Sequence, residues 1–164
     1  MIKMTSIKFE LYDRTEWRDC NRTLHRLDGP AIEFKDGTKK WYFNGKLHRE
    51  GGPAIERING CKWYRFGKLH REDGPAVVWA DGVNEWYLDG KLHRLDGPAM
   101  ILNGHKRWYQ WGELHRADGP AIEWNSGDVE WFYGGVRFND QEDWFNILNK
   151  EDQIAYLFNM EGSK

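Results

Sequence analysis

Five of the six histidines are each followed directly by an arginine, and a row of imidazoles could bind metal or move protons. Successive members of the row are 22 or 23 residues apart. If each interval adds two strands of ~4.8 Å, equivalent imidazoles lie roughly 10 Å apart, too far for two to reach one zinc ion at ~2.0–2.1 Å. We therefore expect no metal site, and we expect each imidazole to hold the next segment by a hydrogen bond. The row comprises His25, His48, His70, His93 and His115.

The arginine of each pair could act with a carboxylate, because in four segments an aspartate follows it two positions later. Side chains two positions apart in extended chain point to the same side, so a charge-assisted hydrogen bond is expected. Acid–base catalysis instead needs converging groups with separated pKa values, whereas this ladder repeats one environment. We expect no enzyme and no cofactor. The pairs are Arg26 with Asp28, Arg71 with Asp73, Arg94 with Asp96, and Arg116 with Asp118, while Arg49 has Gly51 in the aspartate position.

These residues belong to a repeat, His-Arg-x-Asp-Gly-Pro-Ala, followed by a short apolar run, a glycine turn and a Trp-Tyr or Trp-Phe pair. Two slightly different copies alternate, which gives a double unit of 45 residues. The shorter copies turn at Asn59-Gly60 and Asn103-Gly104. Asn-Gly between alternating apolar runs indicates a β-hairpin with a type I′ turn, in which both central residues have positive φ.

The sequence therefore predicts a mostly β protein, in which tandem β-hairpin repeats form one elongated, twisted antiparallel sheet capped by a short C-terminal helical segment. Residues 1–23 are predicted as an N-terminal capping strand segment, residues 24–139 as five hairpin repeats, and residues 140–164 as the helical cap. Asn139 and Asn149 fit helix N-caps, and two short helices or one kinked helix are both open.

The motif resembles MORN-type repeats, and most closely the His-Arg-x-Asp-Gly-Pro-Ala variety found in uncharacterised bacterial and phage proteins. The likeness covers residues 24–139. It implies a hairpin-repeat architecture in a small cytoplasmic protein. If the chain is encoded by a phage, the resemblance further implies an inhibitor that binds a host or anti-phage defence protein in the host cytoplasm.

Departures from the repeat are the places where recognition is expected. The third residue after proline is glutamate in three copies but Val78 and Ile101 in the two central ones, and Phe66 and Trp111 stand beside a turn glycine where other copies have small or polar residues. Apolar residues with a polar rim indicate an interaction patch. We predict Val78, Ile101, Phe66 and Trp111 as partner-binding residues; cover by neighbouring loops, the tail helices or a second copy of the chain is the alternative.

Charge and hydropathy narrow the partner class. The chain carries 24 Lys and Arg against 26 Asp and Glu, which leaves no cation excess for double-stranded nucleic acid. A mean hydropathy of −0.84 and the lack of a long apolar run argue against a membrane partner. The first eight residues lack a secretory signal pattern, and Cys20 and Cys61 are expected to be reduced thiols of a cytoplasmic protein.

We expect a non-catalytic module that binds another protein. The alternative is binding or sequestering of a small ligand such as a nucleotide, held by tryptophan faces and the Arg–His rows around an anion. A homo-oligomer is compatible with either function.

Overall fold

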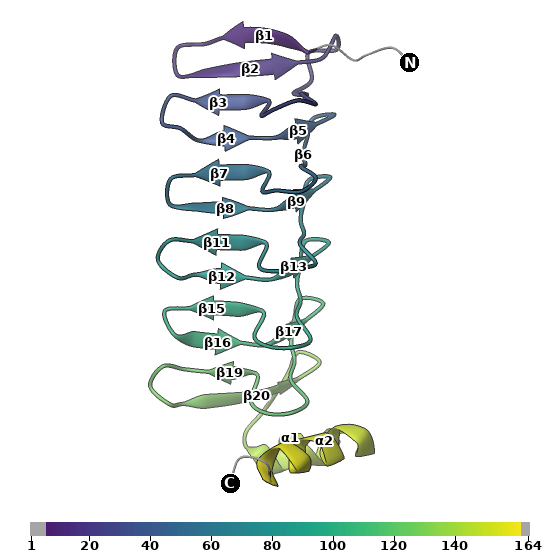
Figure 1. Cartoon of the computed structure of the whole chain (residues 1–164). Helices are drawn as coiled ribbons and strands as arrows, with labels where there is room; N and C mark the ends of the chain where they lie inside the picture. Colours follow the sequence, from purple (N-terminus) through teal and green to yellow (C-terminus); the bar gives the residue numbers. More distant parts are fainter. Residues whose placement is uncertain (1–5, 162–164) are drawn as a thin grey trace. The chain divides into compact units, whose positions relative to one another are not determined.

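The computed structural model describes residues 6–161 as tandem β-hairpins followed by two helices (Figure 1), which confirms the predicted fold class. Residues 1–5 and 162–164 of the two predicted caps lie outside the described part of the chain. Two compact units are present. Among the described residues, the first comprises 6–81 together with Tyr87–Gly90, and the second comprises Gly82–Trp86 together with 91–161.

The first unit contains an antiparallel sheet whose strands follow one another in chain order, with the short strands of the second hairpins left out of it. Its strands, in spatial order, are β1 (Ile7–Glu10), β2 (Arg14–Arg18), β3 (Ile32–Phe34), β4 (Lys39–Lys40), β7 (Ile55–Arg57), β8 (Gly60–Lys62) and β11 (Val77–Trp79). Short second hairpins follow the tryptophans. They are β5 (Tyr42–Phe43) with β6 (Lys46–Leu47), and β9 (Tyr64–Arg65) with β10 (Lys68–Leu69); β13 (Tyr87–Leu88) also belongs to this unit.

The second unit repeats this plan. Its antiparallel strands are β12 (Asn84–Glu85), β15 (Met100–Leu102), β16 (His105–Arg107), β19 (Ile122–Glu123), β20 (Val129–Tyr133) and β21 (Val136–Phe138). Its short strands are β14 (Lys91–Leu92), β17 (Tyr109–Gln110) and β18 (Glu113–Leu114), and the last two pair with each other.

A fully buried alanine joins each repeat to the one before it. The backbone N–H of a tryptophan donates to the carbonyl of the alanine in the next repeat at 2.8 Å, and every one of these alanines has no exposed surface. The pairs are Trp17 with Ala31, Trp41 with Ala54, Trp63 with Ala76, Trp86 with Ala99, and Trp108 with Ala121. The small methyl group lets the two backbones approach, so the motif alanine is explained by this contact.

The second turn of each repeat has positive φ at both central residues, as type I′ turns require. The predicted type I′ geometry is also confirmed at Asn103 and Gly104, whose φ values are 50° and 84°. It is wrong at Asn59 and Gly60, neither of which has a left-handed φ. Gly60 instead begins β8, where a Cβ would overlap the carbonyl of Val78 and the ring of Trp79. Glycine is required there by the close approach of β11.

Two separate helices, α1 (Gln141–Ile147) and α2 (Lys150–Glu161), end the second unit. The N-cap of α1 is Asp140, whose carboxylate accepts the Asp143 N–H at 2.9 Å, so the prediction of Asn139 is wrong by one residue. Asn149 accepts the N–H of Asp152 at 2.9 Å at the start of α2, as predicted.

The helices pack a small core onto the last strands through three buried side chains, Trp144, Leu148 and Tyr156. The Trp144 ring lies 4.7 Å from that of Trp131, and its Nε1 donates to the carbonyl of Arg116 at 3.2 Å. Neither helix within residues 6–161 is long and apolar enough to cross a membrane.

Candidate functional site

Each motif histidine accepts a hydrogen bond from the backbone of the following repeat. The Nδ1 atom receives the N–H of a turn residue 18 or 19 positions later, at 3.1–3.4 Å. A ring nitrogen that accepts a hydrogen bond carries no proton, so this contact requires the proton of a neutral imidazole to lie on Nε2. The donors to His25, His48, His70, His93 and His115 are the N–H groups of Asn44, Phe66, Asp89, Trp111 and Gly134. This contact links successive short hairpins.

Burial favours the neutral imidazole at two of these positions. Removal from water lowers the pKa of His93, and it also lowers the pKa of His115 despite the nearby carboxylates of Asp152 and Glu113. Within residues 6–161 no three His, Cys, Asp or Glu side chains gather in a set that could hold a metal ion.

The guanidinium of each motif arginine lies over the ring of the tryptophan that precedes it. The distance from the guanidinium carbon to the ring centroid is 3.9–4.2 Å in all five copies. In four copies Nε donates to the aspartate two positions later at 2.7–2.9 Å, and in all five Nη1 donates to the carbonyl of the motif proline. The motif glycine lies on the other face, where an added Cβ would come within 2.9–3.0 Å of the guanidinium carbon. The guanidinium thus fills a slot between indole and backbone.

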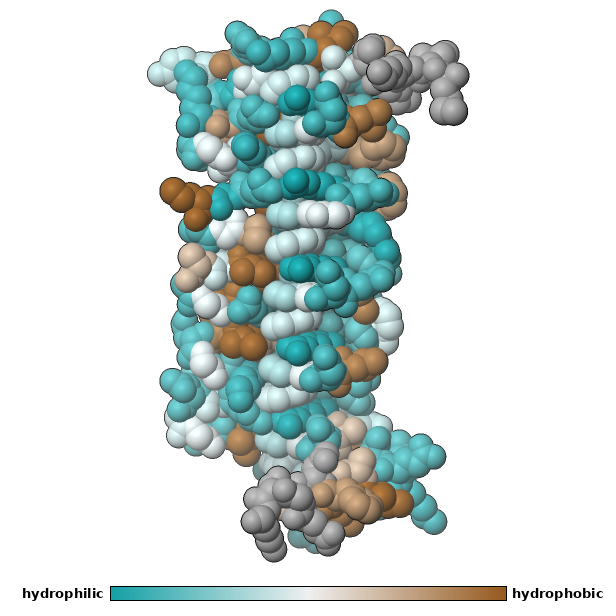
Figure 2. All heavy atoms as spheres, viewed as in Figure 1, coloured by the Kyte–Doolittle hydropathy of each residue, from teal (hydrophilic) through white to brown (hydrophobic). Residues whose placement is uncertain are grey.

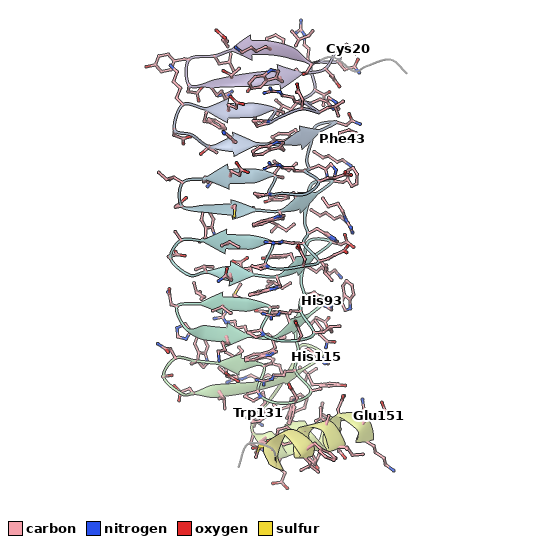
Figure 3. The ribbon with its side chains drawn as sticks, viewed as in Figure 1. Cys20, Phe43, His93, His115, Trp131 and Glu151 are labelled. Atoms are coloured by element: carbon pink, nitrogen blue, oxygen red, sulfur yellow. The ribbon has the colours of Figure 1, made fainter. Side chains whose placement is uncertain are left out.

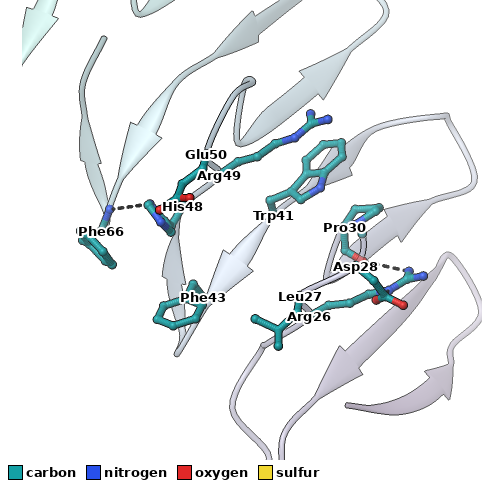
Figure 4. Close-up of a pocket in the computed structure, with 11 residues that line it drawn as sticks. Arg26, Leu27, Asp28, Pro30, Trp41, Phe43, His48, Arg49, Glu50 and Phe66 are labelled. Atoms are coloured by element: carbon teal, nitrogen blue, oxygen red, sulfur yellow. Dashed lines mark hydrogen bonds and ion pairs between the residues drawn. The ribbon is translucent and has the colours of Figure 1, made fainter. Parts of the chain in front are cut away.

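A groove of about 680 Å³ opens in the first unit between the first and second copies of the motif. Figure 4 shows Trp41 in its middle, with Phe43 and Phe66 on one side. The Phe66 ring stacks on His48 at 4.2 Å between centroids and lies 6.3 Å from the Phe43 ring. The full lining is Arg26, Leu27, Asp28, Gly29, Pro30, Trp41, Phe43, His48, Arg49, Glu50 and Phe66.

The corresponding hollow in the second unit is smaller and more polar. It measures about 370 Å³ and lies between the fourth and fifth copies, where Gln110 stands in the place of Phe43. Leu95 lines it as Leu27 lines the first groove, yet no exposed aromatic ring is among its lining residues. An aromatic cluster beside the motif therefore distinguishes the groove of the first unit.

The four predicted partner-binding residues fall in different surroundings. Phe66 is 54% exposed and lines the first unit's groove, and Trp111 is 55% exposed in the second unit, where it stacks on His93 at 4.3 Å. Val78, on β11 of the first unit, is half-buried opposite Cys61. Ile101, on β15 of the second unit, is half-buried between β12 and β16.

Phe66 and Trp111 share a strained backbone. Their φ values are +49° and +52°, at the turn position where other copies have asparagine, aspartate or glycine. Bulky L-residues rarely adopt this left-handed conformation, which costs about 1–2 kcal/mol.

Sequence reasoning missed Phe43 and Leu27, which supply the rest of the groove's apolar surface. Phe43 lies in the short hairpin, two residues after the motif tryptophan (Figure 3), at a position that holds a different residue in every copy. That variability is the signal that could have singled it out. Leu27 stands at the unspecified position of the motif and is 65% exposed.

No protein-family model, curated protein or solved structure matches the chain. The resemblance to MORN-type repeats therefore stays a prediction. The groove and the residues around it are the features that bear on function.

Proposed function

We propose that this chain is a non-catalytic repeat module that binds a protein partner, and that the groove around Phe66 is a contact surface. The observation that carries the proposal is Phe66 itself, an exposed aromatic ring held at φ +49°. Backbone strain of this kind persists where the side chain is needed, and functional sites are where it gathers. Aromatic side chains are also enriched at the centres of protein interfaces.

The shape and chemistry of the groove support a protein rather than a catalytic substrate. Its walls combine the apolar faces of Trp41, Phe43 and Phe66 with a rim of Asp28 and Glu50. Elsewhere, the face of the molecule in Figure 2 carries its hydrophobic residues in separate groups among hydrophilic ones. Because the motif resembles repeats of phage and bacterial proteins, a host or anti-phage defence protein in the cytoplasm is the partner class we propose.

Binding of a nucleotide by the Arg–His rows has less support. Four of the five motif guanidiniums already hold an aspartate, and all five motif histidines use Nδ1 for a backbone N–H. A phosphate group would have to displace these internal contacts before it gained any of its own.

The test is capture of partners from a bacterial lysate by the tagged full chain, with mass spectrometry to identify them. Phe66→Asn removes the ring and installs the residue that the first copy has at this turn, Asn44. Trp111→Asn makes a matched change in the second unit. We expect at least one protein captured by the parent and by Trp111→Asn to be lost with Phe66→Asn.

An unchanged partner set in the folded Phe66→Asn variant would contradict the proposal. Val78→Glu and Ile101→Glu test the other predicted contact residues in the same assay. A rise in melting temperature with millimolar ATP would favour the nucleotide alternative, because a ligand that binds only the folded chain stabilises it by an amount that grows with the logarithm of its concentration over its dissociation constant.

A further inference from the structure

The second copy of the motif lacks the residue that normally completes the arginine slot. In the other four copies the arginine Nε donates to an aspartate Oδ1, and three of those aspartate side chains are 83% exposed. The aspartate therefore meets the guanidinium at its solvent-facing edge. In the second copy Gly51 takes this position with a left-handed φ of +71°, and no neighbouring atom occupies the space of a side chain.

Arg49 nevertheless keeps the pose of its counterparts. Its guanidinium carbon lies 3.9 Å from the centroid of the Trp41 ring, and Nη1 donates to the Pro53 carbonyl at 3.1 Å and to the carboxylate of Glu56. Among the residues that the structure describes, Nε and Nη2 have no acceptor. The Arg49 side chain is 31% exposed, against 18–25% for the other four. One edge of this guanidinium thus has no internal partner, and Arg49 is among the residues that line the groove.

The natural ligand of such an edge is a carboxylate. The Nε and Nη2 protons of arginine point in parallel and match the two oxygens of a carboxylate in a bidentate pair. The stack on Trp41 and the bond to Pro53 already fix the side chain. A ligand that binds this edge therefore avoids most of the cost of ordering a flexible arginine.

The surrounding charges select a single carboxylate over a phosphate or an acidic run. Asp28 and Glu50 also line the groove, and its second cation, Arg26, is already paired with Asp28. A dianion would be repelled by the carboxylates of Asp28 and Glu50, and among the described residues no second cation with a free hydrogen-bonding edge lines the groove to balance its charge. One carboxylate flanked by apolar groups can instead pair with Arg49 while its neighbours contact the apolar lining of the groove, such as Trp41 and Leu27.

We propose that Arg49 binds the side-chain carboxylate of an aspartate or glutamate that a protein partner presents between apolar residues. The proposal rests on the function proposed above for the identity of the occupant. The open guanidinium itself is tested without the partner, so the two ideas can fail separately.

The first experiment follows the Nε–H signals of the arginine side chains of the full chain by NMR. The probes are the peptide acetyl-Leu-Asp-Leu-amide, its asparagine counterpart and inorganic phosphate. We expect the aspartate peptide to shift the Arg49 signal at millimolar concentration, and to leave the signals of the four aspartate-paired arginines in place. Equal shifts with the asparagine peptide, or a larger shift with phosphate, would overturn the assignment of a carboxylate site.

The second experiment compares Gly51→Asp with Gly51→Asn, which are similar in size and both tolerated at positive φ. The aspartate restores the motif residue of the other copies, whose backbone there lacks the left-handed φ of Gly51, and we expect it to pair with Arg49 internally. We expect it to abolish the response to the peptide and to weaken partner binding about tenfold or more, while asparagine leaves both nearly unchanged. Similar behaviour of the two variants would refute the proposal.

The outcomes separate the two claims. If Arg49 responds to the aspartate peptide but no partner depends on Phe66, the carboxylate site stands and the proposed function fails. If a partner depends on Phe66 but neither the peptide nor Gly51→Asp affects Arg49, the proposed function stands and the carboxylate site fails.

Discussion

Replacing Phe66 should separate the strain in its backbone from the packing of its ring. About half of the Phe66 surface is covered, chiefly by the stack on His48. A fully buried aromatic side chain removes ~150–250 Å² from water, so half of it is worth about 2–3 kcal/mol at ~25 cal/mol per Å². Against this, the left-handed φ of +49° costs about 1–2 kcal/mol for any residue other than glycine, asparagine or aspartate.

The two terms predict different outcomes for two substitutions. Phe66→Ala loses the packing and keeps most of the strain, so we expect it to lower the free energy of unfolding by about 2 kcal/mol. Phe66→Asn loses the same packing but relieves the strain, so its stability should lie within about 1 kcal/mol of the parent. Asparagine should therefore exceed alanine by about 1–2 kcal/mol at this position.

Urea unfolding followed by tryptophan fluorescence measures both variants, with Asn44→Ala as the matched control in the first copy. That control changes the conformational preference at an equivalent turn, whose φ is +47°, without removing a large ring. The free energy of unfolding lost on Asn44→Ala should equal, to within about 0.5 kcal/mol, the difference in free energy of unfolding between Phe66→Asn and Phe66→Ala. If Phe66→Asn is no more stable than Phe66→Ala, strain at this turn is negligible and the main support for the proposed function is lost.

Three further predictions concern the second unit and the thiols. Burial lowers the pKa of His93 and His115 below the ordinary value of 6.5, so the folded chain binds protons at these sites less readily than the unfolded chain. The free energy of unfolding is therefore highest above pH 6.5 and decreases as the pH falls through the lowered pKa. Urea midpoints should drop between pH 7.5 and 5, and His93→Asn should weaken that dependence. Burial raises the pKa of the partly exposed Cys61 thiol whereas Cys20 is exposed, so a thiol reagent at pH 8 should label Cys20 faster than Cys61 in the folded chain, and unfolding should remove the difference. Trp144→Ala should cost about 3–5 kcal/mol and release the helices, seen as helical circular dichroism lost at lower urea than in the parent; retention of that signal at the parent midpoint would contradict the packing described.

Local chemistry in the sequence predicted the parts of the fold that depend on near neighbours. The hairpins, the pairing of Arg26 with Asp28 and the cap at Asn149 all involve residues within a few positions of one another. The contact that joins repeats was not predictable in the same way. It places the Trp41 N–H on the carbonyl of Ala54, and this register is set by the packing of whole repeats.

Two predictions from the sequence differ from the structure, one for the role of Gly60 and one for the place of Trp17 in the repeat. Gly60 follows an asparagine and resembles a turn residue, yet it is needed because β11 passes too close for a side chain. The N-terminal segment is predicted as a capping strand, but Trp17 is not recognised as a member of the repeat, because it precedes Trp41 by 24 residues and no Gly-Pro-Ala lies before it. The structure gives Trp17 the same bonds to Ala31 and Arg26 that the later tryptophans make.

The two departures in the groove are linked by their energetics. The motif favours an aspartate at position 51 as the partner of Arg49, and the left-handed backbone favours an asparagine at position 66, although that change would lose the packing of the Phe66 ring on His48. Both favoured residues occur at the same positions of the first copy, as Asp28 and Asn44. The second copy instead leaves one guanidinium edge without an internal partner and exposes a strained ring, and Arg49 and Phe66 both line the same groove. The open edge of Arg49 has no partner within the described chain, and the strain at Phe66 offsets much of what its packing contributes, so we expect both features to serve a contact outside the chain.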